Sequence, residues 1–125
     1  TLIINKDYDM PIYKYIFITP WLGLNQENYD IYKEKYINAC NKEKTQFFKS
    51  IITGNILSFA KGIGWWIEEK ITVVPSLSEI SVKFKNKDMI GFTGYFFSNI
   101  YLPEYIGIGK SISRGFGTLI RETVI

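Results

Sequence analysis

The sequence contains no histidine and a single cysteine, Cys40. One cysteine excludes a disulfide within the chain and fits a reducing compartment such as the cytoplasm. Histidine and cysteine are the ligands that most structural and catalytic zinc sites use. We therefore predict no metal site, no metal cofactor and a cytoplasmic location.

Long apolar runs are also missing. No segment resembles a signal peptide, and no apolar run approaches the length of a membrane span, so we expect no membrane partner. The 125 residues predict one domain, and a hydrophobic content of 46% is enough for a packed core. The chain starts with Thr1 rather than Met, so we expect a fragment or a processed start.

The positive charge is unevenly placed. Residues 80–125 carry six basic and three acidic side chains, whereas the basic and acidic side chains of residues 1–79 balance. The whole net charge of +3 therefore belongs to the C-terminal part. A local excess of Lys and Arg is typical of nucleic-acid binding, and solvated lysines on a strand are the alternative.

The pattern of apolar residues predicts an α+β domain with helices on one face of a mostly antiparallel sheet. Tyr29, Tyr32 and Tyr36 recur at helical spacing and favour a packed helix face over a base-stacking platform. The expected elements are a strand over Ile12–Leu22, a helix capped by Asn25 and interrupted at 38–42, a helix over about 44–61 closed by Gly62, a strand over Trp65–Val74, a turn at Pro75–Ser76, a strand through Ile80, Val82 and Phe84, a turn at 86–88, a strand over Met89–Phe97, a loop over Ser98–Ile106 and a strand over Thr118–Ile125.

Two further expectations concern single segments. Gly54 lies inside the second predicted helix, where glycine costs about 1 kcal/mol relative to alanine. We expect it to allow a close contact between helix and sheet. The hairpin is expected to project Lys83, Lys85 and Lys87 outward on one arm.

A glycine-rich stretch near the end has the most informative pattern. Gly107-Ile108-Gly109 and Gly115-Phe116-Gly117 enclose Lys110, Ser111, Ile112, Ser113 and Arg114. Exposed N–H groups in glycine turns form anion sites, and Lys and Arg add charge, so phosphate is the expected ligand. A glycine-rich turn without a ligand is the alternative.

Two common phosphate motifs are excluded. A Walker A loop needs a glycine five residues before Gly109, where this chain has Glu104. A dinucleotide fingerprint counted from Gly107 or Gly115 reaches Ile112 or Ile120 instead of the third glycine.

The double Gly-hydrophobic-Gly pattern with five residues between its halves resembles the glycine-rich loop of CRISPR repeat-processing endoribonucleases of the RAMP superfamily. The flanking segments Gly91–Phe96 and Leu102–Ile106 resemble the same family, as do Phe17–Trp21 and Gly54–Lys61. The resemblance implies a ferredoxin-like (RAMP- or RRM-like) fold. It implies a single RAMP domain over residues 12–125, with residues 1–11 as a connector from a missing N-terminal lobe or as an edge strand. Since such a fold has a second helix before its last strand, and Ser98–Ser113 is rich in Gly and Pro, we expect a shortened helix or a structured loop there.

The resemblance also implies a function. The family cuts the repeat RNA of pre-crRNA without metal, by attack of a ribose 2′-hydroxyl that leaves a cyclic phosphate. Its partners here are then CRISPR repeat RNA, the N-terminal lobe of the same protein and, as a further option, other CRISPR effector subunits. The expected RNA-binding residues are Gly107, Gly109, Lys110, Ser111, Ser113, Arg114, Gly115 and Gly117 of the loop, with Lys83, Lys85 and Lys87 of the hairpin.

The catalytic residues remain unassigned by the sequence. The family's usual base is a histidine of the N-terminal lobe, and this chain has none. A Lys or Tyr could replace it only with a strongly shifted pKa. We therefore expect the chain alone to bind RNA without cutting it. A non-catalytic RAMP subunit on guide RNA, and a protein-interaction domain using Tyr29, Tyr32 and Trp65, are the alternative hypotheses.

Overall fold

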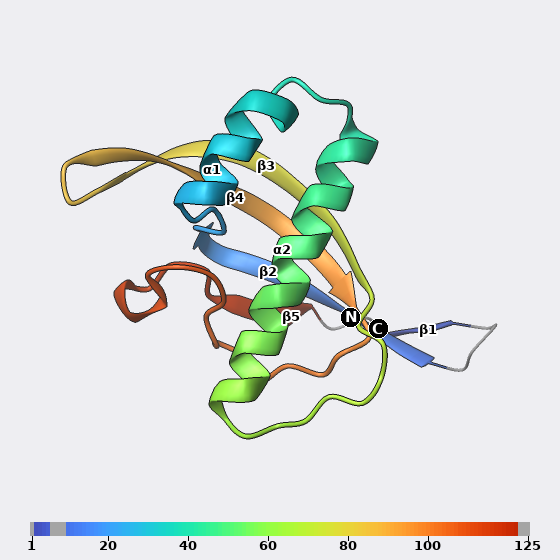
Figure 1. Cartoon of the computed structure of the whole chain (residues 1–125). Helices are drawn as coiled ribbons and strands as arrows, with labels where there is room; N and C mark the ends of the chain where they lie inside the picture. Colours follow the sequence, from blue (N-terminus) through green and yellow to red (C-terminus); the bar gives the residue numbers. More distant parts are fainter. Residues whose placement is uncertain (1, 6–9, 123–125) are drawn as a thin grey trace.

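The computed structural model describes residues 2–5 and 10–122. It shows a five-stranded sheet with the helices packed on one face (Figure 1). The elements are β1 (Leu2–Asn5), β2 (Met10–Trp21), α1 (Gln26–Ile31), a π-helical turn (Tyr32–Tyr36), α2 (Asn41–Gly62), β3 (Val73–Phe84), β4 (Lys87–Ser98), a 3-10 turn (Ile112–Arg114) and β5 (Leu119–Glu122).

The sheet has the connectivity of a ferredoxin-like domain. All paired strands are antiparallel, β4 lies between β2 and β3, and β5 pairs with β2. A second helix normally precedes the last strand of this fold. Here residues 99–118 form a loop whose only helical part is the 3-10 turn Ile112–Arg114, as far as the described residues show. The predicted fold class and the predicted structured loop are both confirmed.

The entry to the first helix follows the expected capping pattern. The Asn25 side chain accepts a hydrogen bond from the Asn28 N–H at 2.8 Å, which satisfies one of the free donors at the start of α1. Tyr32 is buried, and Tyr29 and Tyr36 pack partly buried against the core. The prediction of a packed tyrosine face is confirmed, and part of the Tyr29 side chain stays accessible beside a pocket.

The core lies between α2 and the sheet. Phe48, Ile52 and Ile56 of α2 are buried against the aromatic side chains of β2 and β4, among them Trp21 and Phe92. Burying one such side chain contributes about 1.5–3 kcal/mol. Trp21 also donates its indole N–H to Asn55 Oδ1 at 2.9 Å, so that the end of β2 is joined to α2.

The expected strand over Trp65–Val74 and the turn at Pro75–Ser76 are wrong. Residues 65–72 are irregular, and β3 runs unbroken from Val73 through Pro75 to Phe84. Proline is tolerated there because β3 is an edge strand, which pairs with β4 alone in the described sheet.

The hairpin turn and the ends of α2 also differ from the expectation. The turn is Lys85–Asn86, with φ values of 52° and 62°, rather than residues 86–88. These left-handed values suit a two-residue turn between twisted strands. The second helix begins at Asn41, and Gly64 with φ 74° follows its end in place of Gly62.

The N-terminal segment is described only in part. Leu2–Asn5 pairs with β2 as an added strand, and Thr1 and residues 6–9 lie outside the described residues. Its role as a connector to another lobe stays a prediction. Residues 123–125 of the expected last strand are likewise outside. Within the described parts of the chain, no helix combines the length and the apolar character that a membrane crossing needs.

Candidate nucleic-acid interface

The glycine-rich loop is fastened to the end of β2 by main-chain hydrogen bonds. Its two arms pair with each other, with the Ile108 N–H donating to the Gly117 carbonyl at 3.1 Å. The Gly117 N–H then donates to the Pro20 carbonyl, and the Lys110 N–H to the Leu22 carbonyl, both at 2.8 Å. The base of the loop therefore has a defined position on the sheet.

Two of the predicted glycines are needed to close this base. Gly117 has φ 71°, and a Cβ there would lie 2.1 Å from the Ile108 carbonyl oxygen. Gly109 has φ 95°, and its Cβ would lie 2.7 Å from the indole nitrogen of Trp21. Both conditions favour glycine over every residue with a side chain. Their contact with RNA stays a prediction, and their packing role is what the geometry shows.

The tip of the loop faces solvent. Lys110, Ser113 and Arg114 are exposed, and Ser111 is half-buried in a left-handed conformation with φ 58°. No acceptor in the described part of the chain takes a hydrogen bond from the N–H of Ser111. The tip therefore presents cations and hydrogen-bond donors together, which is the chemistry that phosphate needs.

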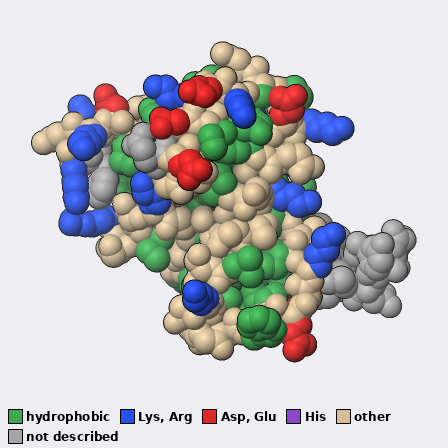
Figure 2. All heavy atoms as spheres, viewed as in Figure 1, with side chains coloured by type: hydrophobic (Ala, Val, Ile, Leu, Met, Phe, Trp, Pro, Cys, Tyr) green, Lys and Arg blue, Asp and Glu red, His purple; other side chains and the backbone are tan. Residues whose placement is uncertain are grey.

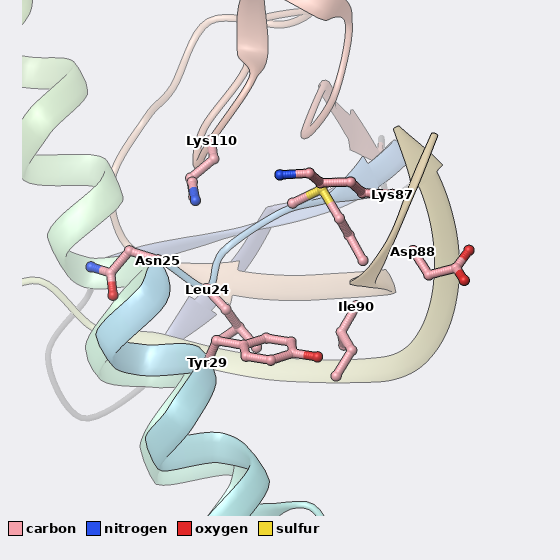
Figure 3. Close-up of a pocket in the computed structure, with 8 residues that line it drawn as sticks. Leu24, Asn25, Tyr29, Lys87, Asp88, Ile90 and Lys110 are labelled. Atoms are coloured by element: carbon pink, nitrogen blue, oxygen red, sulfur yellow. The ribbon is translucent and has the colours of Figure 1, made fainter. Parts of the chain in front are cut away.

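A pocket of about 320 Å³ joins the loop to the hairpin. Figure 1 shows that the β3–β4 hairpin and the loop project from the same end of the molecule, near the start of α1. In Figure 3 the amino groups of Lys87 and Lys110 approach the space from opposite sides, and the carboxylate of Asp88 points away from it. Two cations that converge without an intervening carboxylate create a field that attracts an anion.

The three hairpin lysines do not share one face. Lys83 pairs with Asp88 and Phe84 pairs with Lys87 in the strand register. Because successive residues point to opposite faces, Lys83 and Lys87 lie on opposite faces of the hairpin. Lys85 is exposed in the turn. The prediction that the three lysines project outward on one arm of the hairpin is therefore wrong. Of these three lysines, only Lys87 lines the pocket together with Lys110. Figure 2 shows Lys and Arg side chains gathered along the edge of the molecule from which the hairpin projects.

A second hollow, of about 410 Å³, lies on the other side of Lys110, against α2. Its wall includes Ser50, Gly54, Asn55 and Ser58. A Cβ at Gly54 would meet no atom within 4 Å, so the expected close helix–sheet contact at this glycine is wrong. Sequence reasoning missed this wall because α2 and the loop are far apart in the chain, and no local pattern marks it.

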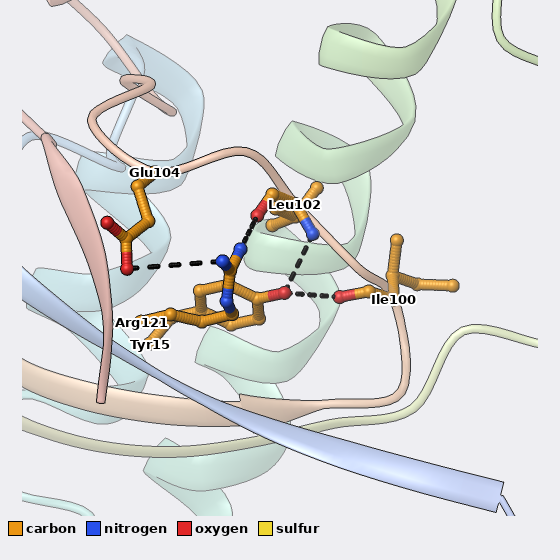
Figure 4. Close-up of polar contacts among 5 residues, drawn as sticks. All are labelled: Tyr15, Ile100, Leu102, Glu104 and Arg121. Carbon is orange, nitrogen blue, oxygen red and sulfur yellow. Dashed lines mark hydrogen bonds and ion pairs between the residues drawn. The ribbon is translucent and has the colours of Figure 1, made fainter. Parts of the chain in front are cut away.

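The segment before the loop is held by the buried Tyr15 and the half-buried Arg121 (Figure 4). The Tyr15 hydroxyl donates to the Ile100 carbonyl at 2.6 Å and accepts from the Leu102 N–H at 2.7 Å. Arg121 donates to the Leu102 carbonyl at 2.7 Å and lies 4.0 Å from a carboxylate oxygen of Glu104. Arg121 is therefore engaged in structure, and its charge is not free for RNA.

The tyrosines with shifted pKa values are unsuited to act as bases. Burial raises the pKa of Tyr15 to about 12. Burial, and then the hydrogen bond that the Tyr32 hydroxyl donates to Glu79, raise the pKa of Tyr32 as well. Both hydroxyls hold their protons at neutral pH. Within the described residues, no three His, Cys, Asp or Glu side chains gather as a metal-binding group.

The protein-interaction hypothesis expects Tyr29, Tyr32 and Trp65 to be exposed, but the structure exposes a different aromatic side chain. Tyr32 is buried, and Tyr29 and Trp65 are partly buried. The exposed aromatic side chain of this region is Trp66, at 83%. These three side chains therefore give no support to the protein-interaction hypothesis.

Comparison with known proteins identifies the family. Residues 7–122 match the model of the Cas6b C-terminal domain. Two crystal structures, one described as the CRISPR RNA processing endoribonuclease Cas6b and one as Cas6b, each match with a TM-score of 0.82 and 47% sequence identity. Each match covers 89% of this chain and 55% of the other, so the chain spans about half the length of these relatives.

The chain is also similar to a curated protein. An uncharacterized protein of Methanocaldococcus jannaschii is 40% identical over 109 residues, which cover 86% of this chain and 71% of that protein. The resemblance that the glycine pattern suggests is confirmed by a family model that spans nearly the whole chain. The chain belongs to the Cas6b C-terminal domain family.

Proposed function

We propose that this chain is the RNA-binding C-terminal lobe of a metal-independent CRISPR endoribonuclease that acts in the cytoplasm on the repeat RNA of pre-crRNA. Its partners are that RNA, the N-terminal lobe of the full-length protein and other CRISPR effector subunits. The similarity to Cas6b supports the substrate class. The convergence of Lys87 and Lys110 beside the exposed loop tip is the structural observation that carries the proposal.

The proposed reaction divides its tasks between the lobes. A base removes the proton of the ribose 2′-hydroxyl, the oxygen attacks the adjacent phosphorus, and the 5′-oxygen leaves with a proton from an acid. The products are a 2′,3′-cyclic phosphate and a 5′-hydroxyl. This chain supplies cations and N–H donors that hold the phosphate groups and offset charge on them. We assign the base to the other lobe because this chain has no histidine, and the buried Tyr15 and Tyr32 keep their protons at neutral pH.

The lysine pair provides the direct test. Replacing Lys87 and Lys110 together by alanine should weaken binding of labelled repeat RNA, and the slope of affinity against salt should fall by about two. The melting temperature should stay unchanged, because both side chains are exposed. Filter binding across a salt series measures the affinity and the slope.

The matched control is the variant in which Lys42 and Lys61 of α2 become alanine. Both are exposed, and the loss of charge is the same, but neither lines the pocket. It should bind RNA nearly as well as the wild type. Equal losses in the two variants would show a diffuse charge effect and contradict the assigned interface. In EDTA, the chain alone should leave repeat RNA intact, and efficient cutting would contradict the division between lobes.

A further inference from the structure

The pocket between the loop and the hairpin has an apolar floor. Leu24, Tyr29 and Ile90 line it, and Figure 3 shows the Tyr29 ring in the floor with its hydroxyl toward Ile90. Tyr29 is only partly buried, and its hydroxyl makes no hydrogen bond to another described residue. An accessible ring with a free hydroxyl can contact a flat, polar-edged group such as a nucleobase.

The rim of the same pocket is cationic. Lys87 and Lys110 reach in from opposite sides. Aromatic floors beside lysines are the common arrangement for single-stranded nucleic acid, in which a base contacts the ring and the cations hold the backbone. Phosphate alone would not need the apolar floor.

The size and polarity of the pocket restrict the occupant. A volume of about 320 Å³ is at the lower limit of small-molecule sites, which is room for one nucleotide and not for a duplex. A base within a helix is stacked and cannot reach the floor. Asp88 points away from the space, so the rim offers no carboxylate to read the edge of a base.

We infer that this pocket receives one unpaired nucleotide of the bound RNA, with its base against Tyr29 and its flanking phosphates between Lys87 and Lys110. The inference rests on the proposed function, since it names the part of the RNA that the site takes. The few polar groups at the floor make the site tolerant of base identity, while the presence of a base is required.

An abasic scan tests this inference. A CRISPR repeat RNA from the same source is prepared with one nucleotide at a time replaced by an abasic ribose, which keeps every phosphate. For the 125-residue chain, removal of the base at one position should weaken binding roughly 10-fold, within the range of base–aromatic contacts. Removal at most other positions should change affinity little.

The substitution Tyr29→Leu should abolish this sensitivity, because it removes the ring but keeps an apolar side chain. Tyr29→Phe should keep most of it. Tyr36→Leu is the matched control, since Tyr36 belongs to the same tyrosine face but stacks on Phe47, with ring centres 4.5 Å apart, outside the pocket. The melting temperatures of the two leucine variants show whether loss of packing explains any change.

The outcomes separate the inference from the proposed function. Tight, salt-sensitive binding with no sensitive position, or sensitivity that survives Tyr29→Leu, would overturn the nucleotide pocket and leave the RNA-binding lobe standing. Failure of the wild-type chain to bind repeat RNA even at low salt would overturn the proposed function itself.

Discussion

The segment that replaces the second helix of the fold has two halves that are held in different ways. Residues 99–106 are held largely by side chains, with the Tyr15 hydroxyl bridging the Ile100 carbonyl and the Leu102 N–H. Main-chain hydrogen bonds join only Tyr105 and Ile106, at the end of this segment, to Leu119 among the described residues. Residues 107–117 are held by main-chain bonds to Pro20 and Leu22 at their base, and their tip is exposed.

The difference explains where binding groups can be placed. In the first half, the main-chain groups of Ile100 and Leu102 are already paired inside the protein, so they stabilise the fold and are not available to a ligand. In the second half, backbone hydrogen bonds and the buried side chain of Ile108 fix the base, whereas Lys110, Ser113 and Arg114 of the tip are exposed. A rigid base with a free tip is a common arrangement for binding loops.

The largest expected effect is a loss of stability on substitution of Gly117, at the base of the glycine-rich loop. Gly117→Ala should lower the free energy of unfolding by about 3 kcal/mol, because it adds left-handed strain and a clash with the Ile108 carbonyl. Urea unfolding measures the loss. Gly115→Ala is the control, since Gly115 has φ 92° but open space around its Cβ. Its cost should be only about 1 kcal/mol, and equal costs would refute the role assigned to the base.

A slightly smaller loss of stability is expected on substitution of Tyr15, which holds residues 99–106. Tyr15→Phe keeps the ring but leaves the buried Ile100 carbonyl and Leu102 N–H without their partner, at a cost of about 2 kcal/mol. Affinity for RNA at a temperature where the variant is folded should be unchanged. A clear loss of affinity with intact stability would mean that the first half also takes part in binding.

The pH dependence of stability separates the halves further. The pKa of Tyr15 rises from 10.0 to about 12 on folding, so the folded state holds this proton more tightly than the unfolded state. The corresponding stability is complete below pH 10 and is lost as the pH rises toward 12. Thermal melts should therefore fall more steeply over this range for the wild type than for Tyr15→Phe. Parallel curves would show that this hydroxyl does not titrate as described.

The smallest expected effect is a gain in stability on substitution of Gly54, in the part of α2 that faces the loop across the second hollow. Gly54→Ala should raise the free energy of unfolding by about 1 kcal/mol, because alanine favours the helix and its Cβ meets no atom within 4 Å. Thermal melts measure the gain. Ser58→Ala, on the same wall of the hollow, controls for a general response of this surface and should change stability little. A loss of stability in Gly54→Ala would reveal a packing role that the structure does not show.

Part of the fold and of the site could be predicted from local patterns. Asn25 ahead of a helix, alternation along β3 and β4, and glycines that flank a charged tip are local signals, and each marks a real element or loop. The errors fall where a local signal is weak. Pro75 suggests a turn, but the edge position of β3 lets the strand continue through it.

The sequence by itself determined the family, the α+β sheet and the presence of a cationic loop framed by glycines, because these depend on residue type and spacing. It left the subfamily open, and the Cas6b family model supplies that. Only the tertiary structure decided that Lys87 joins Lys110 beside Tyr29 while Lys83 faces away. These residues come from three segments that are distant in the chain. Their meeting depends on strand register and on the attachment of the loop to the end of β2, which no local pattern encodes.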